Sequence, residues 1–353
     1  MASIVDFTNF SFSAEQIRDI NELVFDEVLH APDLNFIHSM HTGIVYDREI
    51  GFIGEGGLVG VAKQGCNPTP QDFAIGTRKV TWTPKAWEIL LDECATDLAS
   101  TAAIYAQHKG NRVDDLTDTD YMAIVVQVLE AAIRDFFYRI LWLGDTAADN
   151  VSAGGVITNG VDKKYFNLLD GFFKQLRAAV VAKPALGVTI AANQQATYAA
   201  QDSNMTDAAA IALLEAMYYA APIELRTSGN MRFLVTQSVA DAYQKYLVGK
   251  GIESTYRNLV DGLNSLTYLG IPVIAMPIWD KQIRAYEDNG TAYSFPHRAV
   301  LIEKDNLAVG TPSSEAYESA NIWYERKDRK NYIEVMDKID GKLLNTGRLI
   351  YAE

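Results

Sequence analysis

The chain has 353 residues, of which 48% are hydrophobic and 22% are charged, and this composition is that of a folded protein with a sizeable core. It carries 31 Lys and Arg against 45 Asp and Glu, a formal net charge of −14, which argues against a protein that gathers nucleic acid by neutralising phosphates. No apolar run is long enough to cross a bilayer and the N-terminus lacks the pattern of a signal peptide, so no membrane association is expected. Cys66 and Cys94 have no metal-binding or redox spacing; two free thiols are predicted, with a single disulfide as the alternative.

The first 32 residues are predicted to contain a short amphipathic helix behind an aromatic segment. A capping box over 13–16 precedes one apolar stripe, and Pro32 lies just beyond the helix end. Such a segment either ties down a neighbour or packs on its own domain, and the pattern does not decide between the two. The aromatic and stripe residues are Phe7, Phe10, Phe12, Ile17, Ile20, Val24 and Val28.

The stretch 43–76 holds eight of the 24 glycines and is flanked by alternating apolar patterns at 44–52 and 80–82. Alternation with a period of two predicts strands, so we expect a long β-hairpin with a glycine-rich distal part. An isolated two-stranded hairpin is marginally stable in water. Something must therefore lie under it, either its own domain or a neighbouring subunit.

The same glycines suggest a phosphate-binding loop as an alternative. The run from Gly54 to Gly60 has Val59 where the last glycine of a G-x-G-x-x-G motif belongs, and no helical pattern follows it. Because a phosphate loop directs a helix N-terminus at the anion, this nucleotide-binding interpretation is disfavoured.

Two helices are predicted in the next part of the chain. The first runs over 84–108 on apolar residues at helical intervals, beginning with Trp87 and Leu90. The second, over 118–142, has a broad apolar face, ends at Gly144 and is about 38 Å long at 1.5 Å per residue. A helix of this length is expected to form the backbone of a layer packed beneath a sheet.

The remaining patterns mix helices and strands without regular alternation, which is typical of an α+β fold. No internal repeat and no low-complexity linker divides the chain. Helices are predicted over 165–180, 208–219 and 238–247, and strands over 233–236, 271–276, 299–302, 332–337 and 348–351.

No catalytic, cofactor-binding or metal site is predicted. His38 and His41 have an H-x-x-H spacing, but nothing places them on one helix face and no third ligand lies at a familiar spacing. The aspartates within 114–120 are explained by the dipole of the helix that they open. The mixed charges over 325–330 are typical of a solvated turn or an intersubunit salt-bridge patch. Nucleophile-elbow, zinc-protease and catalytic-cysteine signatures do not occur in the sequence.

Six short segments form a set in a fixed order: Leu116-Thr117-Asp118-Thr119-Asp120, Tyr138-Arg139-Ile140-Leu141-Trp142-Leu143-Gly144-Asp145, Gly154-Gly155-Val156, Tyr165-Phe166-Asn167, Leu269-Gly270-Ile271-Pro272-Val273-Ile274, and Ala299-Val300-Leu301 leading to Val309-Gly310. Each is weak alone, whereas their order and spacing between Thr42 and Gly310 are fairly specific. Together they resemble the major capsid proteins of tailed bacteriophages, particularly those of phages that infect Bacteroides-type hosts.

The resemblance implies an α+β chain with the HK97-like major capsid protein fold. In that fold an N-terminal arm and an extended hairpin loop precede a peripheral domain built on a long spine helix, and an axial domain is inserted before the last peripheral strands. The implied parts are an arm at 1–42, an extended loop at 43–86, a peripheral domain at 87–184 with its spine helix at 118–143, an axial domain at 185–290, and a return to the peripheral domain at 291–353.

The resemblance also implies a function: hexamers and pentamers of one chain tile an icosahedral head around double-stranded DNA, in a virion assembled in the bacterial cytoplasm. An acidic wall is compatible with this function, because DNA pumped in by a separate motor need not be attracted. The implied partners are other copies of the chain, portal, scaffold or decoration proteins, and packaged DNA without sequence specificity. Contacts between subunits are expected at Phe7, Phe10, Phe12, Ile17, Ile20, Val24, Phe52, Gly54, Gly56, Gly57, Leu58, Lys63 and Arg78.

Two departures from the family pattern qualify this expectation. No scaffolding segment precedes the arm, so a separate scaffolding protein, or none, is expected. Lys63 lies in the predicted loop, but nothing in the sequence identifies the Asn and Glu partners of the isopeptide bond that welds some relatives, and self-crosslinking is disfavoured. An encapsulin-like nanocompartment shell around an enzyme and a nucleotide-binding α/β enzyme remain as alternatives.

Overall fold

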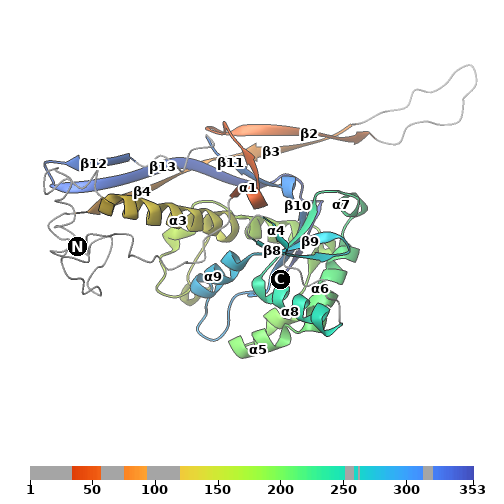
Figure 1. The fold of residues 1–353 in the computed structure, drawn as a ribbon. Helices are drawn as coiled ribbons and strands as arrows, with labels where there is room; N and C mark the ends of the chain where they lie inside the picture. Colours follow the sequence, from red (N-terminus) through yellow and green to blue (C-terminus); the bar gives the residue numbers. More distant parts are fainter. Residues whose placement is uncertain (1–33, 57–74, 94–119, 251–257, 261–262, 313–320) are drawn as a thin grey trace, which may run out of the picture.

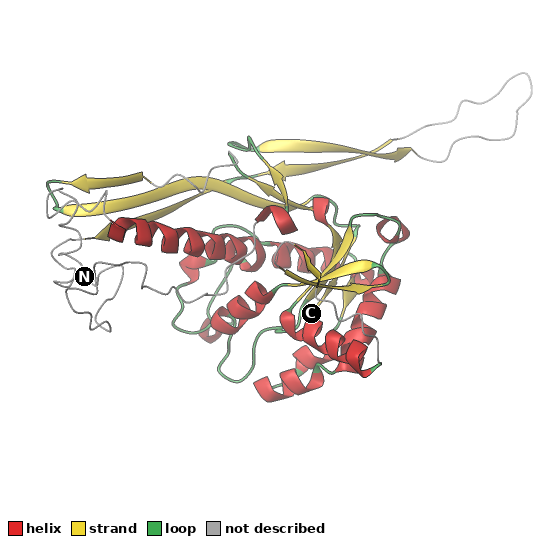
Figure 2. Ribbon diagram, in the orientation of Figure 1, coloured by secondary structure: helices red, strands yellow, loops and turns green. Residues whose placement is uncertain are grey.

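The computed structural model describes residues 34–56, 75–93, 120–250, 258–260, 263–312 and 321–353. Over these residues the chain forms two sheets with helices packed on them, and a two-stranded hairpin projects from this body (Figures 1 and 2). This mixture of helices and strands confirms the predicted α+β class. None of the described helices combines the length and the apolar composition that crossing a bilayer requires.

The larger sheet has the spatial order β5 (Gly187–Val188), β14 (Leu349–Ala352), β10 (Ala299–Glu303), β6 (Met231–Val235), β9 (Ile271–Ala275), β8 (Leu263–Tyr268) and β7 (Asn258–Val260). Strand β10 is antiparallel to both β14 and β6, and β6 is parallel to β9. Almost every residue of β6, β10 and β14 is buried, as expected for strands covered on both faces. The strands predicted over 233–236, 271–276, 299–302 and 348–351 are thus confirmed within one or two residues at their ends.

Helices α4, α6 and α8 pack on this sheet (Figure 1). The Thr206 hydroxyl accepts a hydrogen bond from the Ala209 amide and caps α6, so the helix predicted over 208–219 is confirmed. The helix predicted over 238–247 is also confirmed, whereas the one over 165–180 begins only at Phe172, after a short 3₁₀ turn. The helices are α4 (Phe172–Ala182), α5 (Tyr198–Asn204), α6 (Asp207–Ala220), α7 (Ile223–Arg226), α8 (Gln237–Gly249) and α9 (Pro277–Tyr286).

The second sheet is organised by one long strand. Strand β13 pairs antiparallel with β11, β12 and β4, and β11 pairs in parallel with β1. The strand predicted over 332–337 lies inside β13, and the charged segment 325–330 contains the turn between β12 and β13, where Arg329 has φ +56°. The strands are β1 (Ser39–His41), β4 (Lys85–Glu93), β11 (Leu307–Gly310), β12 (Asn321–Glu325) and β13 (Lys330–Leu343).

The helix predicted over 84–108 is wrong for residues 85–93, which form strand β4. Trp87, Leu90 and Leu91 fit a helical stripe, but Trp87, Ile89 and Leu91 also alternate, and pairing with β13 selects the second pattern. The alternating residues face the core, with Trp87 packed against Phe136 and Phe137 at ring-centroid distances of 5.4 and 5.3 Å. Residues 94–108 lie outside the described part of the chain.

Helix α3 (Asp120–Leu143) runs beneath this second sheet, as the sequence predicted for a long helix over 118–142 (Figure 1). It ends at Gly144, where a Cβ atom would lie 2.3 Å from the Ile140 carbonyl oxygen and 2.7 Å from that of Leu169. Glycine is therefore required by close backbone approach at this position. Near the helix end Trp142 is fully buried against Phe172, Phe173 and Trp279, in an aromatic cluster that joins α3, α4 and α9.

The hairpin consists of β2 (Arg48–Gly56) and β3 (Ile75–Trp82), which extend away from both sheets (Figure 1). Only its base is packed: Trp82, Ile44 and Ala308 form a small cluster of their own, with Ile50 and Leu344 against it. Gly310 allows this contact, because a Cβ there would lie 2.9 Å from the Trp82 ring. The predicted strands at 44–52 and 80–82 are confirmed in part, since pairing begins only at Arg48.

Candidate subunit interface

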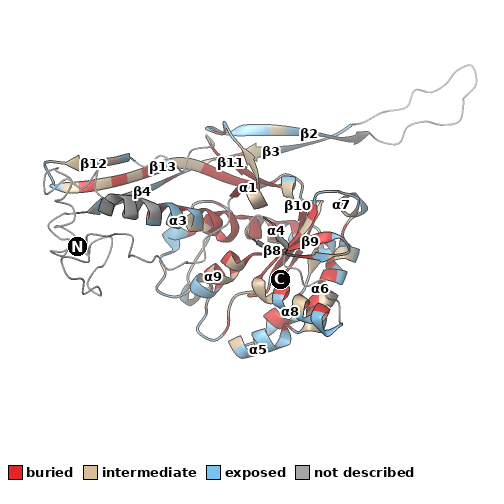
Figure 3. Cartoon of the chain, viewed as in Figure 1, coloured by how far each residue is buried: buried red, intermediate tan, exposed pale blue. Residues whose placement is uncertain are grey.

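Much of the hairpin is exposed (Figure 3), and along β3 exposure increases from the base of the hairpin outward. Trp82 is fully buried, whereas the first five residues of β3 are exposed, and Ile53 and Ile75 are 81% and 50% exposed. Apolar side chains on a two-stranded ribbon have no second layer to cover them in the isolated subunit. The distal half of the hairpin therefore presents a surface that a further layer would stabilise.

The two faces of the hairpin differ in chemistry, because residues opposite each other in an antiparallel pair project to the same side. One face, named here the basic face, pairs Ile50 with Val80 and Phe52 with Arg78, and the Arg78 guanidinium lies 4.5 Å from the Phe52 ring centroid. Arg78 also donates a hydrogen bond to the Leu344 carbonyl oxygen of the body. Arg48 lies on this face as well, opposite Trp82.

The opposite face of the hairpin carries the ion pair between Lys79 and Glu49, at 2.7 Å, together with Gly51, Thr77, Thr81 and the exposed Ile53. At Gly51 on this face, and at Gly76 on the basic face, no atom of the described subunit lies within 4 Å of a built Cβ, and neither residue has a positive φ. Nothing within the described subunit therefore requires glycine at these two positions. Glycine in a strand interior often marks close approach of another backbone.

A second exposed apolar surface lies on the side of the β4–β13–β12 ribbon that faces away from α3. We name it the outer sheet face. Leu90 lies opposite Glu334, and Glu88 lies opposite Met336, so each apolar side chain has an acidic side chain beside it. Leu90 and Met336 are 53% and 58% exposed, and the ring of the partly exposed Trp323 stacks on Tyr332 at a centroid distance of 5.4 Å. Exposed apolar residues that gather in one patch, unlike scattered ones, are typical of interaction surfaces.

The outer sheet face adjoins the root of the hairpin of the same chain. Lys338 of β13 donates a hydrogen bond to the Val45 carbonyl oxygen at 3.0 Å, and its ammonium group lies 5.1 Å from the Tyr46 ring centroid. From this root the hairpin leads away from the face rather than over it (Figure 1). A subunit therefore cannot cover its own outer sheet face with its own described hairpin residues.

His38 fixes the chain to the body just before the hairpin. Its Nδ1 donates to the Leu34 carbonyl oxygen of α1 (Leu34–Ile37) at 3.1 Å, and its Nε2 accepts from Trp142 Nε1 at 3.0 Å. Burial lowers the pKa of His38 to about 3, so the ring is neutral near pH 7. Both ring nitrogens are thus engaged by protein groups, as in an ordinary core histidine.

The structure describes only some of the residues predicted at the interface. Phe52, Gly54 and Gly56 lie on β2 and Arg78 on β3, and Phe52 and Arg78 are brought into contact. The inclusion of Gly54 and Gly56 in a strand also counts against the phosphate-loop alternative. The predicted residues outside the described part are Phe7, Phe10, Phe12, Ile17, Ile20, Val24, Gly57, Leu58 and Lys63, together with Cys66 and Cys94.

The outer sheet face was missed by the sequence prediction. Its signal was present in β4, where odd-numbered apolar residues alternate with Glu88, Leu90 and Asp92, but the helical interpretation hid it. Among the described residues, no group of three or more His, Cys, Asp and Glu side chains is arranged to hold a metal ion.

Comparison with known proteins gives no match in sequence and a consistent match in structure. No family model and no curated protein matches the sequence. Several solved phage capsid structures resemble the structure over nearly its whole length. A chain of Gordonia phage Cozz superposes with a TM-score of 0.53 at 9% identity, covering 98% of this chain and 90% of that one. This chain has the HK97-like capsid protein fold.

Two further structures support the assignment of the fold. The mature capsid of bacteriophage PhiM1 gives a TM-score of 0.54 at 10% identity, covering 94% of this chain and 89% of that chain. The capsid of the native GTA particle gives 0.52 at 10% identity, covering 97% and 99%. These matches cover 94 to 98% of this chain, so the fold that the sequence resemblance implied is confirmed. The resemblance to Bacteroides-type phages stays a prediction.

Proposed function

We propose that this chain is the major capsid protein of a tailed bacteriophage and that hexamers and pentamers of it enclose double-stranded DNA. The observation that carries the proposal is the projecting hairpin, whose distal apolar surface has no support within its own described subunit. A chain with this fold that also presents an uncovered outer sheet face has the two halves of a contact that repeats from copy to copy. A heterologous contact of this kind closes into rings when the rotation between neighbouring copies closes.

The chemistry of the two surfaces is complementary. The basic face of the hairpin combines Phe52 with Arg48 and Arg78, whereas the outer sheet face combines Leu90 and Met336 with Glu88 and Glu334. Because the hairpin leads away from its own outer sheet face, the matching face belongs to a second copy. Gly51, on the other side of the ribbon, is then explained by the close approach of a further chain.

The remaining assignments rest on the family resemblance. In the proposed head the arm at 1–42 and the extended loop at 43–86 exchange between neighbours, and the axial domain at 185–290 meets its copies at the ring centre. Residue 290, the proposed end of the axial domain, does not divide the seven-stranded sheet. Strands β10 and β14, which follow residue 290, pair with each other and with β6 and β5, which precede it. Portal, scaffold or decoration proteins and packaged DNA are the proposed partners beyond the chain itself.

The proposal is tested first by electron microscopy of the purified chain with light scattering for mass. Shells, or rings of five and six subunits, are the expected result. A homogeneous monomer or dimer at every protein and salt concentration would overturn the proposal. The contents then separate a phage head from a nanocompartment: nucleic acid supports the head, and an enclosed enzyme supports an encapsulin-like shell.

The contact is tested by a charge exchange. Glu88→Lys with Glu334→Lys, and separately Arg48→Glu, should each reduce the yield of shells at least tenfold, because like charges then meet across the contact. Combining the three changes should restore part of the yield. Glu49→Gln with Lys79→Gln, on the opposite face of the hairpin, is the matched control and should leave the yield near wild type. Equal loss in the control and the test variants would refute the proposed pairing of surfaces.

A deletion tests the loop more coarsely. Removal of residues 54–65 should abolish stable shells while leaving a folded subunit, since the described core lies in the body and at the base of the hairpin. If the shortened chain still forms stable shells, the role of the extended loop over a neighbour is wrong.

A further inference from the structure

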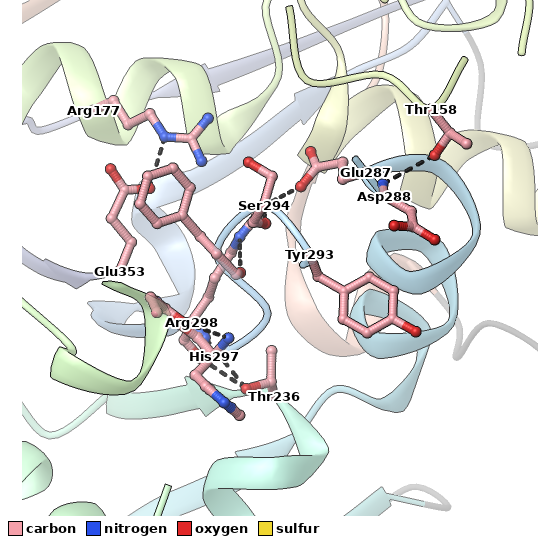
Figure 4. A network of polar contacts seen from close by, with 12 residues as sticks. Thr158, Arg177, Thr236, Glu287, Asp288, Tyr293, Ser294, His297, Arg298 and Glu353 are labelled. Atoms are coloured by element: carbon pink, nitrogen blue, oxygen red, sulfur yellow. Dashed lines mark hydrogen bonds and ion pairs between the residues drawn. The ribbon is translucent and has the colours of Figure 1, made fainter. Parts of the chain in front are cut away.

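The connection between α9 and β10 is a polar hub that several parts of the chain share (Figure 4). The Asp288 amide donates to Thr158 Oγ1 at 2.9 Å, and Gln201 of α5 donates to the Tyr293 carbonyl oxygen at 2.9 Å. The His297 amide donates to Asn193 at 3.0 Å. Segments distant in sequence are therefore fastened to the same twelve-residue stretch, 287–298.

A buried ion pair lies at the centre of the hub. Arg298 donates through Nη2 to the Glu287 carboxylate, and the two side chains are 0% and 5% exposed. The guanidinium also donates to the Ser294 and Phe295 carbonyl oxygens at 2.8 and 2.9 Å and lies 4.5 Å from the Phe173 ring centroid. Nη1 of the same group finds no acceptor among the described residues. The pair is thus fixed in direction by several contacts but is not fully satisfied.

A second ion pair and a strained residue adjoin the first. Arg177 of α4 pairs with Glu353 at 2.7 Å, and its guanidinium lies 5.4 Å from the Phe295 ring centroid. Phe295 has φ +48°, a left-handed conformation that a bulky residue adopts only when its surroundings impose it. The hydrogen bond from Arg298 to the Phe295 carbonyl oxygen is one of the contacts that impose it.

The two partners of the central pair belong to different layers. Glu287 follows α9, which is fastened to α3 by the hydrogen bond from Gln282 Nε2 to the Asp135 carbonyl oxygen at 2.9 Å and by the Lys281–Asp135 ion pair. Arg298 immediately precedes β10, in the middle of the seven-stranded sheet. The pair therefore spans the junction between the spine-helix layer and that sheet.

A buried ion pair is a poor source of stability, because the cost of desolvating both charges offsets their attraction, and apolar residues of similar volume often serve as well. Such a pair instead fixes the relative orientation of the segments that carry it, because a guanidinium hydrogen-bonded to several fixed acceptors is compatible with one geometry only. We infer that the Arg298–Glu287 pair locks the angle between the spine-helix layer and the seven-stranded sheet, and that this angle sets the curvature of the shell. The consequence for curvature rests on the proposed capsid function.

The test replaces the pair by apolar residues of similar size, Arg298→Met with Glu287→Leu. Spin labels at Glu130→Cys on α3 and Ala216→Cys on α6, in a chain carrying Cys66→Ser and Cys94→Ser, report the distance between the two layers by double electron–electron resonance. The melting temperature should stay near that of wild type, while the distance distribution should become at least twofold broader. Shells of the unlabelled double variant should vary in diameter where those of wild type are uniform.

Controls separate the lock from simple loss of structure. Arg298→Met alone should melt well below the double variant, because it leaves the Glu287 carboxylate buried without its partner. Arg298→Lys keeps the charge without the planar fork and should broaden the distance distribution even if the double variant folds poorly. A distribution as narrow as wild type in both the double variant and Arg298→Lys would overturn the inference. If wild type itself forms no shells, the proposed function fails, and the distance measurement still decides whether the lock exists.

Discussion

In strand β14 of the seven-stranded sheet every residue is buried, whereas in strand β3 of the hairpin the first five of eight residues are exposed. Both are regular strands, but β14 is wholly apolar, whereas β3 intersperses Ile75, Val80 and Trp82 with glycine, threonine and charged residues. They also differ in what covers them: β14 has strands on both sides and α4 and α6 against it, and β3 has only its partner β2. The first region completes its packing within one subunit, and the second leaves it to be completed by another chain.

Polar groups show the same contrast. Around the seven-stranded sheet even a guanidinium is enclosed, and its charge is matched by a buried carboxylate. On the hairpin the charged groups remain in water, where their attraction for each other contributes little. Substitutions in the apolar core around the seven-stranded sheet should therefore act first on the free energy of unfolding, whereas substitutions on the exposed hairpin should act on assembly without unfolding the subunit. The Arg298–Glu287 pair, inferred above to set the curvature of the shell, is the exception.

The largest expected effect is a decrease in the free energy of unfolding at low pH, caused by His38. Its pKa is lowered from 6.5 to about 3, so between these pH values His38 is protonated in the unfolded chain but not in the folded chain. Stability contributed by the neutral ring is therefore complete above pH 6.5 and falls as the pH falls, by roughly 5 kcal/mol in total at 1.36 kcal/mol per pH unit.

His38→Gln, which keeps a donor and an acceptor but does not titrate in this range, is the reference for that effect. The measurement is the free energy of unfolding of both chains by denaturant from pH 7.5 to pH 3.5. The difference between them should grow in favour of the variant as the pH falls. Parallel curves for the two chains would mean that His38 does not titrate with folding.

The next effect compares two glycines, one in each region. Gly144→Ala places a Cβ 2.3 Å from a backbone oxygen, so the end of α3 must move, and we expect a loss of about 3 kcal/mol in the free energy of unfolding. Gly51→Ala meets nothing within 4 Å and should stabilise the free subunit by about 0.5 kcal/mol, because alanine is less flexible in a strand.

In an assembly assay the order of the two glycine variants should be the reverse of their order in subunit stability. Gly51→Ala should lower the yield of shells although its subunit is at least as stable as wild type, whereas purified Gly144→Ala subunits, where soluble, should lose assembly only in proportion to their unfolding. Denaturant titration and particle counts by electron microscopy check both. Normal shells from Gly51→Ala would show that no chain approaches the hairpin at that position.

This contrast also explains what the sequence could predict. The long helix α3, helices α6 and α8, and the strands of the seven-stranded sheet have patterns set by a core within the same chain, and each was predicted close to its observed bounds. Residues 85–93 were assigned to a helix because Trp87, Leu90 and Leu91 fit a helical stripe, although Trp87, Ile89 and Leu91 also alternate as in a strand. Only the pairing of β4 with β13, about 250 residues later in the chain, selects the strand.

The candidate interface was predictable in part for a similar reason. Glycine content and alternation identified the hairpin, and Phe52 and Arg78 were rightly assigned to it. The alternation in β4 was the local signal of the outer sheet face, but the helical interpretation hid it. The hub around Arg298 gave no local signal, since Glu287 and Arg298 meet only through the fold. Contacts with a second copy are a further step away from sequence patterns, and they stay predictions.

A smaller effect is expected at Asp280, a charged group in the completed region. Burial raises its pKa to about 6 from 3.8, although its carboxylate accepts a hydrogen bond from the Gln237 amide at 2.7 Å. The folded chain thus retains a proton that the unfolded chain has released, and stability rises as the pH falls from about 6 toward 3.8, opposite in sign to His38.

Asp280→Asn removes that titration and keeps an acceptor for the Gln237 amide. At pH 8 it should be more stable than wild type by up to about 2 kcal/mol, allowing for the partial exposure of the side chain, and the gain should vanish near pH 4. Thermal unfolding at the two pH values checks this. A variant less stable than wild type at pH 8 would mean that the charge on α9 stabilises the start of α8 by more than its burial costs.

The smallest effect is expected at an exposed turn of the seven-stranded sheet. The turn between β8 and β9 contains Leu269 at φ +50° and Gly270 at φ +78°, and the Leu269 side chain is 64% exposed. A two-residue turn with both φ values positive favours Asn-Gly, so Leu269→Asn should raise the free energy of unfolding by about 1 kcal/mol. Gly270→Ala, the matched control, should lower it by a similar amount. If Leu269→Asn gains this stability but loses shells, the exposed leucine is retained for contact with another chain, and the division between the two regions is less sharp than their strands indicate. If it gains stability and assembles normally, the seven-stranded sheet is complete within one subunit even at this turn.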